Sequence, residues 1–225
     1  MTEDELQEIV SNHPHLYHMA EEGSWQSIRQ YGLLSTTALL DLYQIEGEER
    51  ETIERRRRPV SVSVNRTGLG MAVIRDQKPL TDASLTRALE DGLTPEDWYR
   101  LLNGKTFFWF KKSRLETFLC AGNYARIYHD VLIVDTESLV ERHRERITLS
   151  PMNSGCSVPF VHKRGLSTFR RISDYPYADR KRRGLEPVVE LVVDHAVPDI
   201  EEFTLRVDSM ACNNTPRTIW RRGDP

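Results

Sequence analysis

Strand-like and helix-like hydrophobic patterns alternate along the chain. Val60, Val62 and Val64 alternate with serines, which is the two-residue period of a strand with one buried face. Residues 107–110 and 131–134 are unbroken apolar runs, which favour buried strands. The same patterns predict further strands at residues 16–19, 71–74, 188–193 and 204–207.

Capping residues mark where the predicted helices begin and end. Ser24 is an N-cap candidate for a short helix that Gly32 ends. Ser113 with Glu116 forms a capping-box pattern, which predicts a helix from there to about residue 128. Charge pairing or apolar spacing predicts further helices within residues 46–58, 80–102 and 139–146. Because short strands outnumber long helices, the pattern predicts an α+β fold.

The length of the chain, 225 residues, predicts a single domain spanning 1–225. We expect residues 46–103 to form a helical insertion and residues 213–225 a loose tail. The formal charge of -3 gives no net positive field, so a polyanionic partner must bind a local patch. The apolar runs are far shorter than the ~20 residues that span a bilayer, and the acidic N-terminus is unlike a signal peptide. The sequence therefore predicts a cytoplasmic protein without a membrane partner.

The three cysteines, Cys120, Cys156 and Cys212, are widely spaced and lack a nearby cysteine or histidine in a metal-ligand pattern. We therefore expect them to be small buried hydrophobic residues. We also expect no metal cofactor.

Three polar residues occupy positions where their side chains are costly. Glu190 lies inside an otherwise apolar strand, where an ionised carboxylate is unfavourable unless a partner or ligand uses it. Arg114 falls in the first turn of a predicted helix, where a cation opposes the helix dipole unless an anion binds there. His18 shares a strand face with Leu16 just before a turn. Each also has an ordinary interpretation: an edge strand facing water, a surface arginine, and a hydrogen-bonded core histidine.

A basic run precedes the strand of Glu190, within a predicted polar loop over residues 172–186. Cations interleaved with aromatic rings are typical of surfaces that follow a nucleic-acid backbone and stack on bases, although a solvated loop has the same composition. The candidate target-binding residues are Tyr175, Tyr177, Arg180, Lys181, Arg182 and Arg183. The role of the polar segments 153–155 and 164–165 stays open, since a polar turn explains them adequately.

Three motifs occur in a fixed order between residues 16 and 200. Residues 16–18 (Leu-Tyr-His) are followed by a short predicted helix and by residues 31–35 (Tyr-Gly-Leu-Leu-Ser). Residues 107–114 combine an aromatic strand with a junction that carries Ser113 and Arg114. The last motif is the strand of Glu190, trailed by a Val-Pro pair. Together they resemble the ADP-ribosyltransferase superfamily, most closely the DarT-type enzymes that modify DNA bases.

The resemblance implies a split, mixed β-sheet core flanked by helices and a reaction that consumes NAD as a co-substrate. It implies that Glu190 holds the 2′-hydroxyl of the nicotinamide ribose and stabilises an oxocarbenium-like transition state. Arg114 is the second implied catalytic residue, near the diphosphate, and Lys112 is the alternative cation. The implied cofactor-binding residues are Tyr17, His18, Trp109, Lys112 and Phe118, with Trp109 or Phe118 stacking on nicotinamide.

The function expected from the resemblance is transfer of ADP-ribose to a nucleic-acid base, DNA or RNA. It implies a toxin or phage-defence effector, with an antitoxin or an ADP-ribose hydrolase as a partner. A protein acceptor or simple NAD hydrolysis would use the same core. Two other classes stay open: an NAD-using RNA 2′-phosphotransferase, and a non-enzymatic nucleic-acid or protein-binding module on the same fold.

Overall fold

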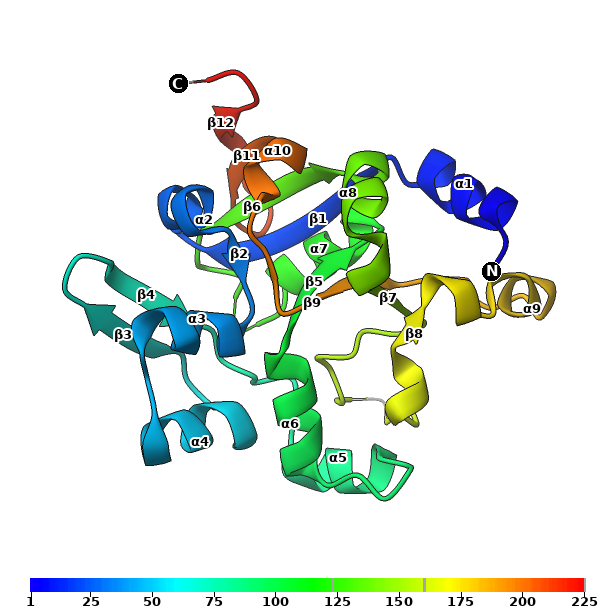
Figure 1. Ribbon diagram of the computed structural model, residues 1–225, viewed down its shortest axis with the longest axis horizontal. Helices are drawn as coiled ribbons and strands as arrows, with labels where there is room; N and C mark the ends of the chain where they lie inside the picture. The colour runs from blue at the N-terminus through cyan, green and yellow to red at the C-terminus, as the bar shows by residue number, and fades with distance from the viewer. Residues whose placement is uncertain (123, 160, 225) are drawn as a thin grey trace.

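The computed structural model describes residues 1–122, 124–159 and 161–224. Within them eight strands form one large sheet with helices against it (Figure 1). In spatial order these strands are β12 (Arg217–Arg221), β11 (Thr204–Met210), β6 (His129–Asp135), β1 (His15–Glu21), β5 (Lys105–Trp109), β9 (Glu190–Asp194), β7 (Ile147–Ser150) and β8 (Arg170–Arg171). Every ladder of this sheet is antiparallel. The α+β class is confirmed, whereas the expected mixture of parallel and antiparallel strands is wrong.

Two small antiparallel pairs lie beside the large sheet, β2 (Leu33–Leu34) with β10 (Ala196–Val197), and β3 (Val62–Arg66) with β4 (Gly70–Ile74). The helices of the described residues are α1 (Glu3–Asn12), α2 (Trp25–Tyr31), α3 (Thr36–Tyr43), α4 (Gly47–Arg55), α5 (Asp82–Ala88), α6 (Pro95–Asn103), α7 (Lys112–Leu119), α8 (Thr136–His143), α9 (Tyr177–Arg182) and α10 (Ile200–Phe203). Three 3₁₀ turns lie at Arg144–Arg146, Leu166–Thr168 and Ile172–Asp174.

The centre of the sheet contains a seam between β1 and β5. These two strands pair at one position, Tyr17 opposite Trp109. By contrast, β1 pairs with β6, and β5 with β9, along their whole lengths. A hydrogen bond of 2.8 Å between His18 Nδ1 and the Phe107 carbonyl oxygen crosses the gap. The sheet thus consists of two halves, one that includes β6 and β1 and one that includes β5 and β9. At the seam between them, the side chain of His18 replaces part of the missing backbone pairing.

The two faces of the sheet pack against different helices. Leu16 and Ala20 of β1 belong to the largest apolar cluster, together with buried residues of α2, α8 and α10. Met19, on the opposite face, packs with Leu115 and Leu119 of α7. This alternation is the two-residue period that the sequence shows for these strands.

The region 46–103 is not only helical. It contains the β3–β4 hairpin as well as α4, α5 and α6, and Figure 1 shows these elements along one side of the molecule. The hairpin forms a small core with α3 and α4, centred on Leu40, Ile53 and Val64. A second small core joins α5 and α6 around Trp98. The insertion therefore contributes to two small apolar cores besides the large one. Its hairpin forms because β-branched valines occupy alternate positions of β3.

The C-terminal segment is not loose. Its strand β12 pairs with β11 at the edge of the sheet, and Trp220 packs against Trp25 with ring centroids 4.8 Å apart. Two of the cysteines are also not free, since Cys120 and Cys212 form a disulfide. Their separation of 92 residues gave no sequence signal for this pairing.

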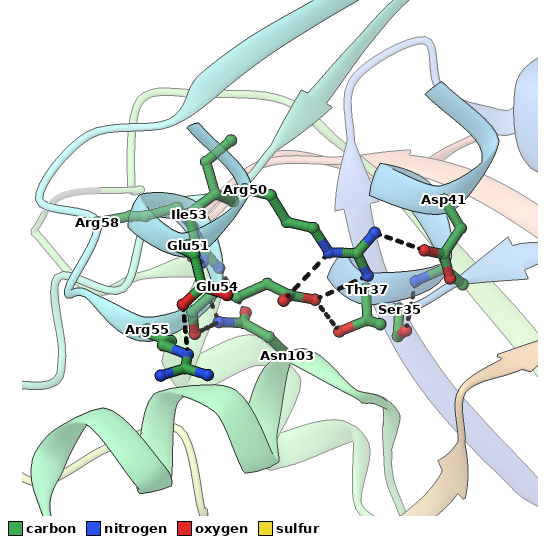
Figure 2. Close-up of polar contacts among 11 residues, drawn as sticks. Ser35, Thr37, Asp41, Arg50, Glu51, Ile53, Glu54, Arg55, Arg58 and Asn103 are labelled. Carbon is green, nitrogen blue, oxygen red and sulfur yellow. Dashed lines mark hydrogen bonds and ion pairs between the residues drawn. The ribbon is translucent and has the colours of Figure 1, made fainter. Parts of the chain in front are cut away.

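A buried polar cluster fastens α4 to α6 (Figure 2). The guanidinium of Arg58 is almost fully buried and donates to the Ile53 carbonyl at 2.5 Å and to Asn103 Oδ1 at 3.0 Å. Asn103 Nδ2 in turn donates to the Glu54 carbonyl at 2.7 Å. Glu54 Oε1 accepts a hydrogen bond from Thr37 at 2.6 Å, which adds α3 to the cluster. Burial lowers the pKa of Arg58 to about 10 against the opposing charge of Asp76, so the guanidinium stays charged near pH 7.

Replacing Asn103 is expected to destabilise the fold. Asn103→Leu removes the acceptor of Arg58 and a donor to the α4 carbonyls, so buried polar groups lose their partners. The free energy of unfolding in urea should fall by about 2–3 kcal/mol. Asn214→Leu, at an exposed position, should change it by less than about 0.5 kcal/mol. Equal losses in the two variants would contradict this role for the cluster.

Candidate functional site at the seam of the sheet

A cavity of about 520 Å³ opens beside the seam. Its walls come from β1, the α2–β2 turn, α3, β4, β5, α7, the loop at 153–155 and the first residue of β9. This volume is typical of pockets for small molecules and cofactors, which span about 300–1,000 Å³. We call it the main cavity.

Glu190 begins β9 and lies opposite Trp109 of β5 and Ser150 of β7. Its side chain lines the main cavity, yet the residue is only 3% exposed. Oε2 accepts two hydrogen bonds from Ser154, from the backbone N–H at 3.1 Å and from Oγ at 2.8 Å. Burial nevertheless dominates and raises the pKa of Glu190 to about 7. The ordinary interpretation of an edge strand facing water is therefore wrong.

Arg164 fixes the loop that supplies Ser154. It is 2% exposed and donates to the carbonyls of Ser154 at 3.0 Å, Cys156 at 2.8 Å and His162 at 3.2 Å. The ring of Trp98 lies 5.7 Å from its guanidinium carbon. Arg164 forms no ion pair with the described residues. The positive charges of Arg114 and Arg164 both lower the pKa of Glu190 and so oppose the effect of burial. Sequence reasoning missed Ser154 and Arg164, because a serine and an arginine in a loop carry no distinctive pattern.

His18 lines the same cavity from the other half of the sheet. A carbonyl only accepts hydrogen bonds, so the contact with Phe107 places the proton on Nδ1. Burial lowers the pKa of His18 to about 4, and the ring is neutral near pH 7. Its Nε2 is then an acceptor for a ligand hydroxyl.

Aromatic rings and one arginine form a further wall of the main cavity. Trp109 packs on Phe118 with centroids 5.5 Å apart, and Phe118 stacks on Tyr124 at 4.8 Å. Arg75, at the end of β4, lies over the Tyr124 ring at 5.4 Å and 3.8 Å from the Glu21 carboxylate. Arg75 was not a candidate in the sequence, because it lies in the insertion for which no motif was found.

The expected anion site at the start of α7 is occupied by the protein itself. Arg114 forms an ion pair with Glu186, and Lys111 contacts the same carboxylate at 3.0 Å. Lys112 pairs with Glu116 at 3.1 Å. Neither Arg114 nor Lys112 lines the main cavity. The helix also begins at Lys112 and ends at Leu119, so the capping box and the longer helix predicted from Ser113 are wrong.

Tyr17 does not line the main cavity. It packs against the apolar cluster of Met19, Leu115 and Leu119 on the α7 side of the sheet, as its partner Trp109 does. Of the implied cofactor-binding residues, His18, Trp109 and Phe118 line the cavity, whereas Tyr17 and Lys112 do not.

The predicted target-binding segment forms a short helix rather than a polar loop. Tyr175 and Tyr177 are buried, and their hydroxyls donate to the Pro187 carbonyl and to Glu8. Their rings are therefore not exposed platforms for bases. Arg180 donates to the carbonyls of Glu186 and Pro187. The other basic residues form ion pairs: Lys181 with Glu8, and Arg182 and Arg183 with Asp179.

Within the described ranges, no group of three or more His, Cys, Asp or Glu residues is placed to hold a metal ion. A search of the same residues finds no helix with the length and apolarity needed to cross a membrane.

The fold and the site define an α+β protein with a buried, weakly acidic glutamate at a ligand-sized cavity between two halves of a sheet. The chain belongs to the DUF7002 family, a family of unknown function whose profile matches residues 14–204. The match includes both His18 and Glu190. No curated protein and no solved structure gives a significant match.

The raised pKa of Glu190 predicts a characteristic pH dependence of stability. Between pH 4.5 and about 7 the folded chain holds a proton at Glu190 that the unfolded chain releases, so stability from this group falls as pH rises. Glu190→Gln removes this loss. The free energy of unfolding of the variant relative to the wild type should rise by up to ~3 kcal/mol across that window.

Glu186→Gln is the control of opposite sign. Hydrogen bonds and charge from Arg114 and Lys111 outweigh burial and lower the pKa of Glu186, so its contribution grows as pH rises through the ordinary range of a glutamate. Relative to the wild type, this variant should lose stability as pH rises toward 4.5. The difference should then stay level between pH 4.5 and 7, the window in which Glu190→Gln gains stability. Parallel curves for both variants would contradict the assignment at Glu190.

Proposed function

We propose that this protein is an NAD-dependent ADP-ribosyltransferase that cleaves the nicotinamide–ribose bond and transfers ADP-ribose to a nucleic-acid base. The observation that carries the proposal is Glu190, a buried carboxylate with a pKa of about 7 in the wall of the main cavity. The motif resemblance assigns the catalytic role to this same residue. Support also comes from His18, which reaches the cavity from the opposite half of the sheet.

The main cavity offers groups that suit each part of NAD. Trp109 and Phe118 give an aromatic wall for nicotinamide. The free Nε2 of His18 accepts a hydrogen bond from a ribose hydroxyl. Among the described residues three cations line the cavity, Arg58, Arg75 and Lys105, whereas Arg114 does not. Arg58 is bound to the Ile53 carbonyl and Asn103, and Lys105 to Asp194, so we assign the diphosphate to Arg75.

Glu190 serves two steps of the reaction. Its Oε2 is held by Ser154, and no described residue donates a hydrogen bond to Oε1, which is left to bind the ribose 2′-hydroxyl. As the C–N bond breaks, its electron pair leaves with nicotinamide and positive charge develops on the ribose, where the carboxylate stabilises it. A nitrogen of the acceptor base then bonds to the ribose carbon and gives its proton to Glu190, whose pKa suits a general base near neutrality.

The resemblance also supports the wider proposal. The protein would act as a cytoplasmic toxin or phage-defence effector, and an antitoxin or an ADP-ribose hydrolase would be its partner. DNA and RNA are both candidate acceptors, so the test includes each.

Nicotinamide release from NAD tests the chemistry directly. The wild type should release nicotinamide, with stimulation by the nucleic acid that accepts ADP-ribose. Glu190→Gln should lower the rate roughly 100-fold or more. Glu202→Gln, which makes the same change at an exposed position on α10, should leave it unaltered. Retention of the wild-type rate by Glu190→Gln, or no release with either nucleic acid, would refute the proposal.

The rate should also depend on the ionisation of Glu190. Because the carboxylate is the active form, release should increase with pH and level off above about 7. Ser154→Ala removes a hydrogen bond to the ionised form, so the acidic limb should move about one unit higher. If the acidic limb of the pH–rate profile is unchanged in Ser154→Ala, the pH dependence does not arise from the ionisation of Glu190.

A further inference from the structure

A second, smaller cavity lies on the other side of the loop that holds Glu190. Its volume is about 220 Å³, and it is lined in part by Pro151 and Met152. The next residues of the same loop, Asn153 and Ser154, line the main cavity. Since Met152 and Ser154 are two residues apart, their Cα atoms are separated by no more than about 7 Å. The two cavities are therefore neighbours across one stretch of backbone.

The wall of the second cavity is strongly basic. Four of its residues are cations, Lys163, Arg164, Arg170 and Arg180, against one carboxylate, Glu90. None of the four forms an ion pair with the described residues, although several other arginines and lysines of this chain do. The described wall therefore carries an excess of positive charge, which attracts an anion into the cavity.

Two of these cations are held rigidly and two are available to a ligand. Arg164 and Arg180 donate to main-chain carbonyls, those of Ser154 and Cys156 and those of Glu186 and Pro187, which fixes their guanidinium groups. Arg170 is exposed and uses Nε alone, in a contact of 3.3 Å with the Ser167 carbonyl. Its two terminal nitrogens, and the exposed ammonium of Lys163, have no acceptor among the described residues.

We propose that the second cavity binds one phosphate group of a nucleic-acid strand. A phosphate matches the donor set, because guanidinium groups bind its oxygens in pairs and a neighbouring ammonium adds charge. Resting on the proposed function, the bound phosphate belongs to the acceptor strand. It lies a few residues of backbone from Ser154, which donates hydrogen bonds to Glu190. The site thus anchors the nucleic-acid strand whose base receives ADP-ribose. The strand is held by a phosphate contact beside the loop of Met152 and Ser154, and not by stacking of its bases on exposed aromatic rings.

Adjacent arginines provide a matched pair of variants. Arg170 lines the cavity, whereas Arg171 pairs with Asp194 at 3.0 Å and does not line it. Without NAD, we would measure the binding of single-stranded DNA and RNA oligonucleotides at several salt concentrations. Arg170→Ala should weaken binding roughly tenfold and reduce the slope of log K against log salt by about 1. Arg171→Ala should weaken it by no more than about twofold.

A variant of Glu90 tests the site in the opposite direction. Glu90→Gln removes the one carboxylate of the described wall and should tighten oligonucleotide binding several-fold. Glu137→Gln, an exposed glutamate on α8 outside both cavities, makes the same change in net charge and should have little effect. Equal effects of these two variants would mean that net charge alone controls binding, and would overturn the site.

Inorganic phosphate distinguishes the source of the ligand. It should compete with the oligonucleotide, and its own binding, followed by calorimetry, should depend on Arg170 but not on Arg171. Phosphate binding without oligonucleotide binding would overturn the assignment to a nucleic-acid strand. Indistinguishable Arg170→Ala and Arg171→Ala variants would overturn the cavity as a phosphate site. These measurements use no NAD, so their outcome is independent of nicotinamide release.

Discussion

The central constraint on this structure is the burial of one carboxylate, that of Glu190, at the seam of the sheet, which costs free energy of folding. Glu190 is removed from water at the start of a strand whose next three residues are apolar. Two hydrogen bonds from Ser154 and the charge of Arg164 compensate for part of the lost hydration. The remaining cost of burial raises the pKa of Glu190, and the general-base role that we propose for this carboxylate depends on that rise.

The insertion over residues 46–103 has a structural role at this site. The backbone N–H of Arg164 donates to the carbonyl of Ala88, the last residue of α5. Its carbonyl accepts from the N–H of Glu90, two residues further on. The side chain of Arg164 lies over Trp98 of α6. The helices of the insertion therefore support the loop that orients Ser154 toward Glu190. The same insertion places Arg75 on the wall of the main cavity. It therefore both supports the loop of Ser154 and supplies a residue that lines the cavity.

Parts of this arrangement were readable from sequence because they depend on local periodicity. The strands of His18 and Glu190 follow from alternating or continuous apolar residues, and α2 ends at the predicted glycine. The pairing of Arg114 with Glu186, the disulfide, and the contact of Arg164 with Ser154 link segments with no shared pattern. Such contacts arise only when distant segments meet, and a loop residue gives no periodic signal of its partner. The hairpin, by contrast, was visible in the alternating valines, although the region around it was taken to be helical.

The Cys120–Cys212 disulfide joins the end of α7, which carries the Phe118 wall of the main cavity, to the segment just after β11. Disulfides persist in oxidising compartments and are uncommon in a reducing cytosol. In a reducing cell the end of this helix would lose its covalent link to the sheet, and the aromatic wall would be less firmly held. The rigidity of the cavity wall thus depends on the redox state of the surroundings, through two cysteines that do not themselves line the cavity.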